Sequence, residues 1–222
     1  ELYLRAAAWC LRHGRSALVL TPEIALSSQV AARFSARFGN QVAILHSALT
    51  PVERAATWRG VADGVYPIVV GPRSALFAPV QNLGLIVLDE EHDQAYKQGE
   101  TPRYHTRAVA EFLASETGAT LLLGSATPAT ETFWRAEQGE ITRLDLPERV
   151  GPALRKDDGS YAGSVLELPR VEIADMRLEL HRGNTSLLSE SLQEVLGATL
   201  RRGEQAILLL TRIVDAVSDP LI

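Results

Sequence analysis

The 222-residue sequence contains little cysteine, few aromatic residues and no long hydrophobic run. Its one cysteine, Cys10, excludes an internal disulfide and a cysteine-built zinc site within this chain, and indicates a reducing, cytoplasmic environment. No apolar run approaches the ~20 residues of a membrane span, and residues 1–5 show neither a basic leader nor a signal-peptide core. The formal net charge of −5 argues against a globally basic, histone-like DNA-binding protein, but it leaves a local DNA-binding groove open.

Short apolar runs alternate with amphipathic stretches along the chain. Buried strands are predicted at 16–20, 41–45, 68–70, 85–88 and 120–123, and helices at 1–12, 25–37, 50–63, 107–115 and 129–138. Thr50, Pro51 and Glu53 predict a capping box at the start of the third helix. Phe34 and Trp134 lie on predicted helices and are expected in the core. This alternation predicts an α/β fold in which helices cover both faces of a parallel sheet.

The composition changes near Pro147, which predicts two lobes. Residues 1–146 are expected to form the first lobe, residues 147–170 a linker, and residues 171–222 an incomplete second lobe. The second lobe would contain a strand at 171–173, a helix at 189–201 and a strand at 205–210. Because the opening helix has no preceding cap and the pattern is lost after Thr211, both ends are expected to be cut from a longer protein.

Carboxylates follow the strand at 85–88, in the order Asp89-Glu90-Glu91-His92. In open α/β sheets, ligands bind at the carboxyl ends of the strands. Asp89 there can hold a Mg²⁺ ion through water, and Glu90 can activate the attacking water. The alternative is an acidic turn that caps the next helix, but the Asp-Glu-x-His order after four buried residues favours catalysis.

A second group of polar residues follows the strand at 120–123. Ser125 and Thr127 are expected to hydrogen-bond the acidic motif on the neighbouring strand and to relay its state, although a simple turn before the next helix is the alternative. Thr21 and Pro22 follow the first strand, in the same position relative to the sheet. Loops of this kind suit phosphate contacts on nucleic acid, but each alone also fits an ordinary strand–helix turn.

Two other segments have the composition of a nucleic-acid surface. Arg73 and Ser74 follow the third strand and suit phosphate contacts. Aromatic and cationic residues alternate between 96 and 105, at Tyr96, Lys97, Arg103, Tyr104 and His105. Such a segment can stack on unpaired bases, and the alternative is a surface loop whose tyrosines pack against the domain.

Taken in order, these motifs resemble the superfamily 2 helicases, and among them the bacterial primosomal replication-restart helicases. The matching segments are 21–26, 46–47, 71–79, 89–93, 96–98, 103–105 and 124–128, within a resemblance that covers about residues 1–210. The acidic segment resembles the DEAH box of that family. The resemblance implies RecA-like lobes of an ATP- and Mg²⁺-dependent DNA helicase that acts on single-stranded or forked DNA with primosome and replication proteins.

The resemblance also implies a role for individual residues. Asp89 matches the Mg²⁺ ligand, Glu90 the base, and His92, Ser125 and Thr127 the elements that couple hydrolysis to movement. The residues implied to touch DNA are Thr21, Pro22, Arg73, Ser74, Tyr96, Lys97, Arg103, Tyr104 and His105. The family's Gly-Lys-Thr phosphate loop, arginine finger, zinc-binding cysteines and N-terminal DNA-binding domain are not found in this sequence. The chain alone is therefore expected to hydrolyse ATP poorly, with zinc expected only outside it.

Two other functions fit parts of the pattern. A lobe that binds DNA or a partner without catalysis would not need the phosphate loop. A metal-dependent hydrolase using Asp89, Glu91, His92 and His105 would need these side chains to converge on one ion. The motor interpretation requires instead that Asp89 and Glu90 emerge at the sheet edge that faces the tip of the opening helix.

Overall fold

The computed structural model describes residues 1–22, 29–148, 154–155, 161–162 and 169–209. Tertiary contacts divide the chain into two units, Glu1–Leu144 and Asp145–Ile222. The first unit contains the main sheet with the helices that cover it, and the second contains short elements of its own.

The first unit is built on a five-stranded sheet in the order β2-β3-β1-β4-β5, in which every strand pair is parallel. The strands are β1 (Ser16–Leu20), β2 (Val42–Ile44), β3 (Ile68–Gly71), β4 (Leu83–Asp89) and β5 (Thr120–Gly124). Their positions confirm the five predicted strands. Continuous apolar sequence is required here because both faces of β1, β3 and nearly all of β4 are buried.

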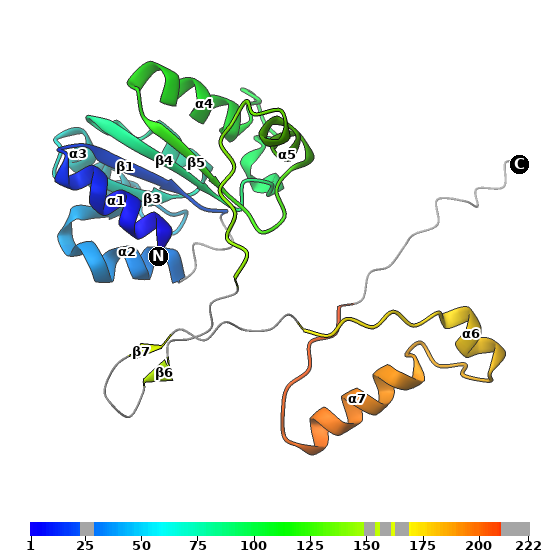
Figure 1. The fold of residues 1–222 in the computed structure, drawn as a ribbon. Helices are drawn as coiled ribbons and strands as arrows, with labels where there is room; N and C mark the ends of the chain where they lie inside the picture. The colour runs from blue at the N-terminus through cyan, green and yellow to red at the C-terminus, as the bar shows by residue number, and fades with distance from the viewer. Residues whose placement is uncertain (23–28, 149–153, 156–160, 163–168, 210–222) are drawn as a thin grey trace, which may run out of the picture. The chain divides into compact units, whose positions relative to one another are not determined.

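Helices cover both faces of this sheet, which confirms the predicted α/β architecture (Figure 1). On one face, α1 (Leu2–Arg12) and α2 (Gln29–Phe38) pack through side chains such as Leu4 and Phe34 against Val19 and Val87. On the other face, α3 (Pro51–Ala62) and α4 (Thr106–Thr117) pack against the sheet together with the 3₁₀ segments η3 (Arg73–Phe77) and η4 (Gln94–Tyr96). A further 3₁₀ turn, η2 (Gly39–Gln41), leads into β2.

Local sequence signals set the ends of these helices. The Thr50 hydroxyl accepts the Glu53 N–H at 3.3 Å, and the Glu53 carboxylate accepts the Thr50 N–H at 2.9 Å, so the predicted capping box is confirmed. Helix α4 ends at Gly118, which has a φ of 62° that glycine adopts without steric cost. Helix α5 (Thr130–Glu137) completes the unit. Its Trp134 is 57% exposed, so the prediction of a core position was wrong for this residue.

The second unit differs from its prediction. It contains a two-stranded antiparallel pair, β6 (Leu154–Arg155) and β7 (Tyr161–Ala162), within the predicted linker, and the helices α6 (Met176–His181) and α7 (Glu190–Arg201). Helix α7 confirms the predicted helix. The strands predicted at 171–173 and 205–210 are not formed by the described residues, where Ile173 is 93% and Ile207 97% exposed. Without a neighbouring strand to pair with, these apolar segments gain no ladder of hydrogen bonds.

Candidate active site

The carboxyl ends of four strands meet at one edge of the sheet. In the sheet register Leu20 lies beside Gly71 on one side and Leu88 on the other, while Asp89 lies beside Gly124. The segments that follow β1, β3, β4 and β5 therefore begin at the same edge, which is where open α/β sheets bind ligands.

Asp89 ends β4 at this edge and is held by two tyrosines. The hydroxyl of Tyr3, in the first turn of α1, donates to Oδ1 of Asp89 at 2.8 Å. The hydroxyl of Tyr96 donates to the main-chain oxygen of Asp89 at 2.6 Å. Burial and then the charge of Asp89 raise the pKa of Tyr3 well above its ordinary value, so its hydroxyl stays protonated as a donor. The contact confirms, for Asp89, the predicted position next to the tip of the opening helix.

Glu90 lies beside a histidine and two hydroxyl groups. Its Oε2 atom is 3.7 Å from Nδ1 of His92, and its side chain is 46% exposed. Nδ1 of His92 lies 2.7 Å from the hydroxyl of Ser125, and Nε2 lies 3.4 Å from that of Thr127. The main-chain N–H of Thr127 also donates to Ser125 at 3.0 Å. The predicted contact between the two hydroxyl residues and the acidic motif is thus confirmed, while their role as a relay stays a prediction.

The burial and the hydrogen-bond partners of Glu91 were not predicted from the sequence. It is 1% exposed, and its carboxylate accepts hydrogen bonds from the main-chain N–H of Ala129 at 2.7 Å, from Thr132 at 3.0 Å and from Arg107 at 3.1 Å. Its partners lie 16 to 41 residues away in sequence, and no local spacing signals them. Because these contacts turn Glu91 into the protein, it is not a ligand in the suggested metal-dependent hydrolase.

Three of the predicted DNA-contacting residues are buried. Tyr96 is 0% exposed, and its hydroxyl oxygen, which donates to Asp89, also lies 3.0 Å from the main-chain oxygen of Leu20. Its ring packs in the core on the α3 and α4 face of the sheet, so the prediction that it stacks on bases was wrong. Thr21 and Pro22 are buried too, and the N–H of Thr21 donates to Gly71 at 3.0 Å, which corrects their predicted contact with nucleic acid. The rest of that predicted motif, 23–26, lies outside the described residues.

The other predicted DNA-contacting residues lie within the segment 96–105 or in η3, which contacts it. Arg73 donates to the main-chain oxygens of Ala95 at 2.9 Å and of Lys97 at 3.2 Å. It therefore fixes the main chain at the start of this segment. Exposed side chains at the surface are Ser74, Lys97 and Arg103. The ring of Tyr104 is partly exposed and meets Phe77 edge to face, with centroids 5.3 Å apart.

His105 caps the start of α4. Its Nδ1 atom accepts the N–H of Arg107 at 3.2 Å, which requires that this nitrogen carries no proton. Burial, followed by the positive charge of Arg107, lowers the pKa of His105 below its ordinary value. The structure therefore gives His105 a local structural role.

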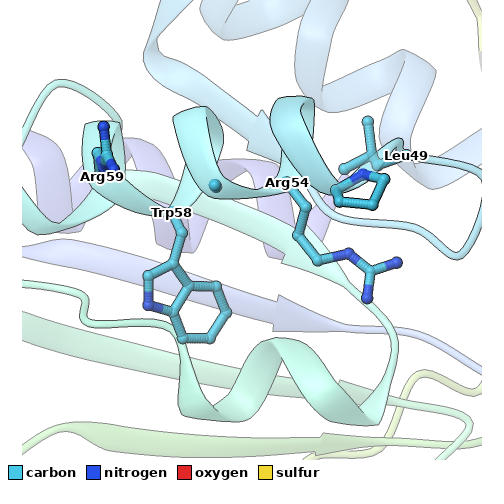
Figure 2. Close-up of a pocket in the computed structure, with 6 residues that line it drawn as sticks. Leu49, Arg54, Trp58 and Arg59 are labelled. Atoms are coloured by element: carbon cyan, nitrogen blue, oxygen red, sulfur yellow. The ribbon is translucent and has the colours of Figure 1, made fainter.

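A pocket with other lining residues lies along α3. It has a volume of about 530 Å³ and is lined by Leu49, Pro51, Arg54, Ala55, Trp58 and Arg59. Figure 2 shows the indole of Trp58 and the guanidinium of Arg54 on the same side of α3. Trp58 packs partly against the core, so its presence is explained by a contribution to the packing of α3.

No group of three or more histidine, cysteine, aspartate or glutamate side chains in the described part of the chain could enclose a metal ion, so the cage needed by the hydrolase alternative is not formed there. Of the helices that the structure describes, none has the length and apolar character needed to cross a membrane.

Comparison with known proteins places these observations in a family. Residues 1–133 match the family model described as DEAD/DEAH box helicase. The chain is 42% identical over 212 residues to the replication restart protein PriA of Bacillus subtilis and 45% identical over 217 residues to that of Synechocystis. Each match covers 96% of this chain but only 25% and 24% of those relatives, so the chain spans about a quarter of their length. The PriA of Treponema pallidum is 40% identical over 96% of the chain, which covers 30% of that relative.

Proposed function

The chain belongs to the DEAD/DEAH box helicase family, and we propose that it supplies part of the motor of an ATP-dependent DNA helicase that acts in replication restart. In this proposal residues 1–146 form the first motor lobe, residues 147–170 a linker and residues 171–222 the start of the second lobe. The similarity to three replication restart proteins supports the biological role, and the DNA substrate and the primosome partners are inferred from it.

The observation that carries the proposal is the meeting of Asp89 with the first turn of α1, through the 2.8 Å bond from Tyr3. An α-helix N-terminus at the carboxyl edge of a parallel sheet favours bound phosphate groups. The partly exposed carboxylate of Asp89 is a hard oxygen donor of the kind that Mg²⁺ prefers. The residues therefore fit Mg²⁺ and ATP, with Asp89 holding the ion through water. Bound MgATP would supply the terminal phosphoryl group that is transferred to water.

Glu90 is the proposed base in this site. Its carboxylate is accessible to solvent, and a glutamate there can accept a proton from the attacking water. His92 lies between Glu90 and the hydroxyls of Ser125 and Thr127, so a change in the charge or position of Glu90 would alter hydrogen bonds to the segment after β5. We infer that these residues couple hydrolysis to movement of that segment.

The proposed DNA surface is smaller than the sequence indicated. It consists of Ser74, Lys97, Arg103 and Tyr104, which are at least partly exposed. Hydroxyl and cationic groups suit phosphate contacts, and the ring of Tyr104 suits stacking on an unpaired base. Arg73 supports this surface indirectly, because it holds the main chain at Ala95 and Lys97.

The test is Glu90→Gln, measured as DNA-stimulated ATP turnover in the longest natural form of the protein that contains residues 1–222. Loss of a general base is expected to lower turnover about 100-fold or more. Glu131→Gln is the matched control, because Glu131 is an exposed glutamate in the first turn of α5. Equal turnover by the Glu90→Gln and control proteins, with DNA binding retained, would contradict the role proposed for Glu90.

A further inference from the structure

The backbone of Glu90 is in an unusual conformation. Its φ is 50°, in the left-handed region, where the β-carbon of most residues meets the main chain. Among the described residues, the other non-glycine residue with positive φ is Asn82, a type that tolerates this region. A glutamate stays in such a conformation only when its surroundings fix the chain on both sides.

The chain on both sides of Glu90 is indeed fixed. On one side, Asp89 pairs with Gly124 in the sheet, and its main-chain oxygen accepts the hydroxyl of Tyr96. On the other side, the N–H of Glu91 donates to the main-chain oxygen of Gly124 at 3.0 Å. Both neighbours of Glu90 are thus attached to the same point of β5, which leaves Glu90 as the residue where the chain must turn.

The Glu91 side chain stabilises the second of these attachments, the hydrogen bond from the Glu91 N–H to Gly124. Its buried carboxylate receives three hydrogen bonds, from Arg107, Thr132 and the N–H of Ala129. Arg107 also donates to Thr132 at 2.6 Å, so the ion pair lies within a closed network. A buried carboxylate with a cation and two further donors is costly to displace, because any movement leaves charged or polar groups without partners.

From this geometry we propose that Glu91 is a positioning residue for Glu90. Its buried network holds residue 90 in the left-handed conformation that keeps the Glu90 carboxylate beside His92. Arg107 lies in the first turn of α4, directly after the segment 96–105, so the network also ties that segment to the conformation of Glu90. The proposal rests on the proposed function only in the role given to Glu90; the conformational claim stands separately.

The conformational claim is tested by comparing Glu90→Gly with Glu90→Ala in the 222-residue chain. Both variants lose the same carboxylate, but glycine adopts a φ of 50° without steric cost and alanine does not. With Glu91 present, the glycine variant is expected to unfold at a higher denaturant concentration than the alanine variant. In a Glu91→Gln background this advantage of glycine over alanine should disappear or reverse. Residue 90 is then free to adopt negative φ angles, where glycine loses more conformational entropy on folding than alanine.

Two outcomes would overturn the proposal: no advantage of glycine when Glu91 is present, or an equal advantage in both backgrounds. If Glu91→Gln does not fold, Arg107→Lys provides the same comparison, because it keeps the positive charge but moves the donor away from Glu91. A smaller advantage of glycine in that background supports the proposal, and an unchanged one refutes it.

A kinetic measurement separates this proposal from the proposed function. In the longest natural form of the protein, Glu91→Gln is expected to lower kcat about tenfold or more while the KM for ATP changes less than about twofold. Unchanged kcat would contradict a positioning role. If Glu90→Gln turns over normally, the role proposed for Glu90 fails, yet the comparison of glycine with alanine still decides whether Glu91 fixes the backbone at residue 90.

Discussion

Gly124 leaves the space that the Tyr3 hydroxyl needs to reach Asp89. A β-carbon at this position would lie 1.7 Å from the Tyr3 oxygen and 2.9 Å from its Cζ atom. The φ of Gly124 is not positive, so the requirement for glycine comes from this close approach. We expect Gly124→Ala to push the Tyr3 ring aside and to break its 2.8 Å bond to Asp89.

The expected loss of stability is about 2 kcal/mol. Overpacking of this kind costs about 1–3 kcal/mol, and a hydrogen bond to a charged acceptor contributes about 1.5–3 kcal/mol, of which part is already included in the displacement of Tyr3. The lower entropy of the unfolded alanine chain offsets about 0.4–1 kcal/mol. Chemical denaturation of the 222-residue chain measures the difference.

A double-mutant cycle with Tyr3→Ala tests the reasoning. Removal of the ring deletes the three atoms that lie nearest to the new β-carbon, so Gly124→Ala should then be close to neutral. Gly99→Ala is the matched control, because nothing lies within 4 Å of a β-carbon there and its φ is not positive. An equal cost of Gly124→Ala with and without the Tyr3 ring would refute the proposed clash.

Two further predictions concern helix caps. Thr50→Ala should lower stability by about 1 kcal/mol through loss of the capping box, and Thr50→Ser should restore it; equal stabilities in denaturation would exclude a contribution from the cap. The lowered pKa of His105 means that its neutral form contributes stability above its ordinary pKa of 6.5, and this contribution is lost as the pH falls through the lower pKa of the folded state. The melting temperature of His105→Asn should therefore fall less steeply with acidification than that of the unchanged chain, and parallel curves would contradict this.

The sheet could be predicted from sequence because its signals are local. Runs such as 16–20 and 85–88 are apolar throughout, and a strand buried on both faces leaves few other possibilities for such a run. The same signal failed at 171–173 and 205–210. A strand exists only where another strand pairs with it, and an apolar segment of sequence does not reveal whether that partner is present.

The candidate site could be predicted in outline only. Asp89, His92, Ser125 and Thr127 came together because parallel strands end at one edge, which topology alone dictates. Burial inside a loop has no such rule. No pattern of residues indicates that Tyr96 is buried while Tyr104, eight residues later, remains partly exposed, since both lie among the same kinds of polar neighbours.

The order of the strands has a mechanical consequence. β4 lies inside the sheet, bonded to β1 on one side and β5 on the other, so we expect its amides to exchange with solvent only when the sheet itself opens. Lys97 and His105 form an antiparallel bridge at the two ends of the neighbouring segment, and Arg73 also donates to the main chain at Lys97, so we expect this segment to open at lower cost than β4. The carboxylates of Asp89 and Glu90 thus follow a rigid strand, while the neighbouring segment can change its conformation without opening the sheet.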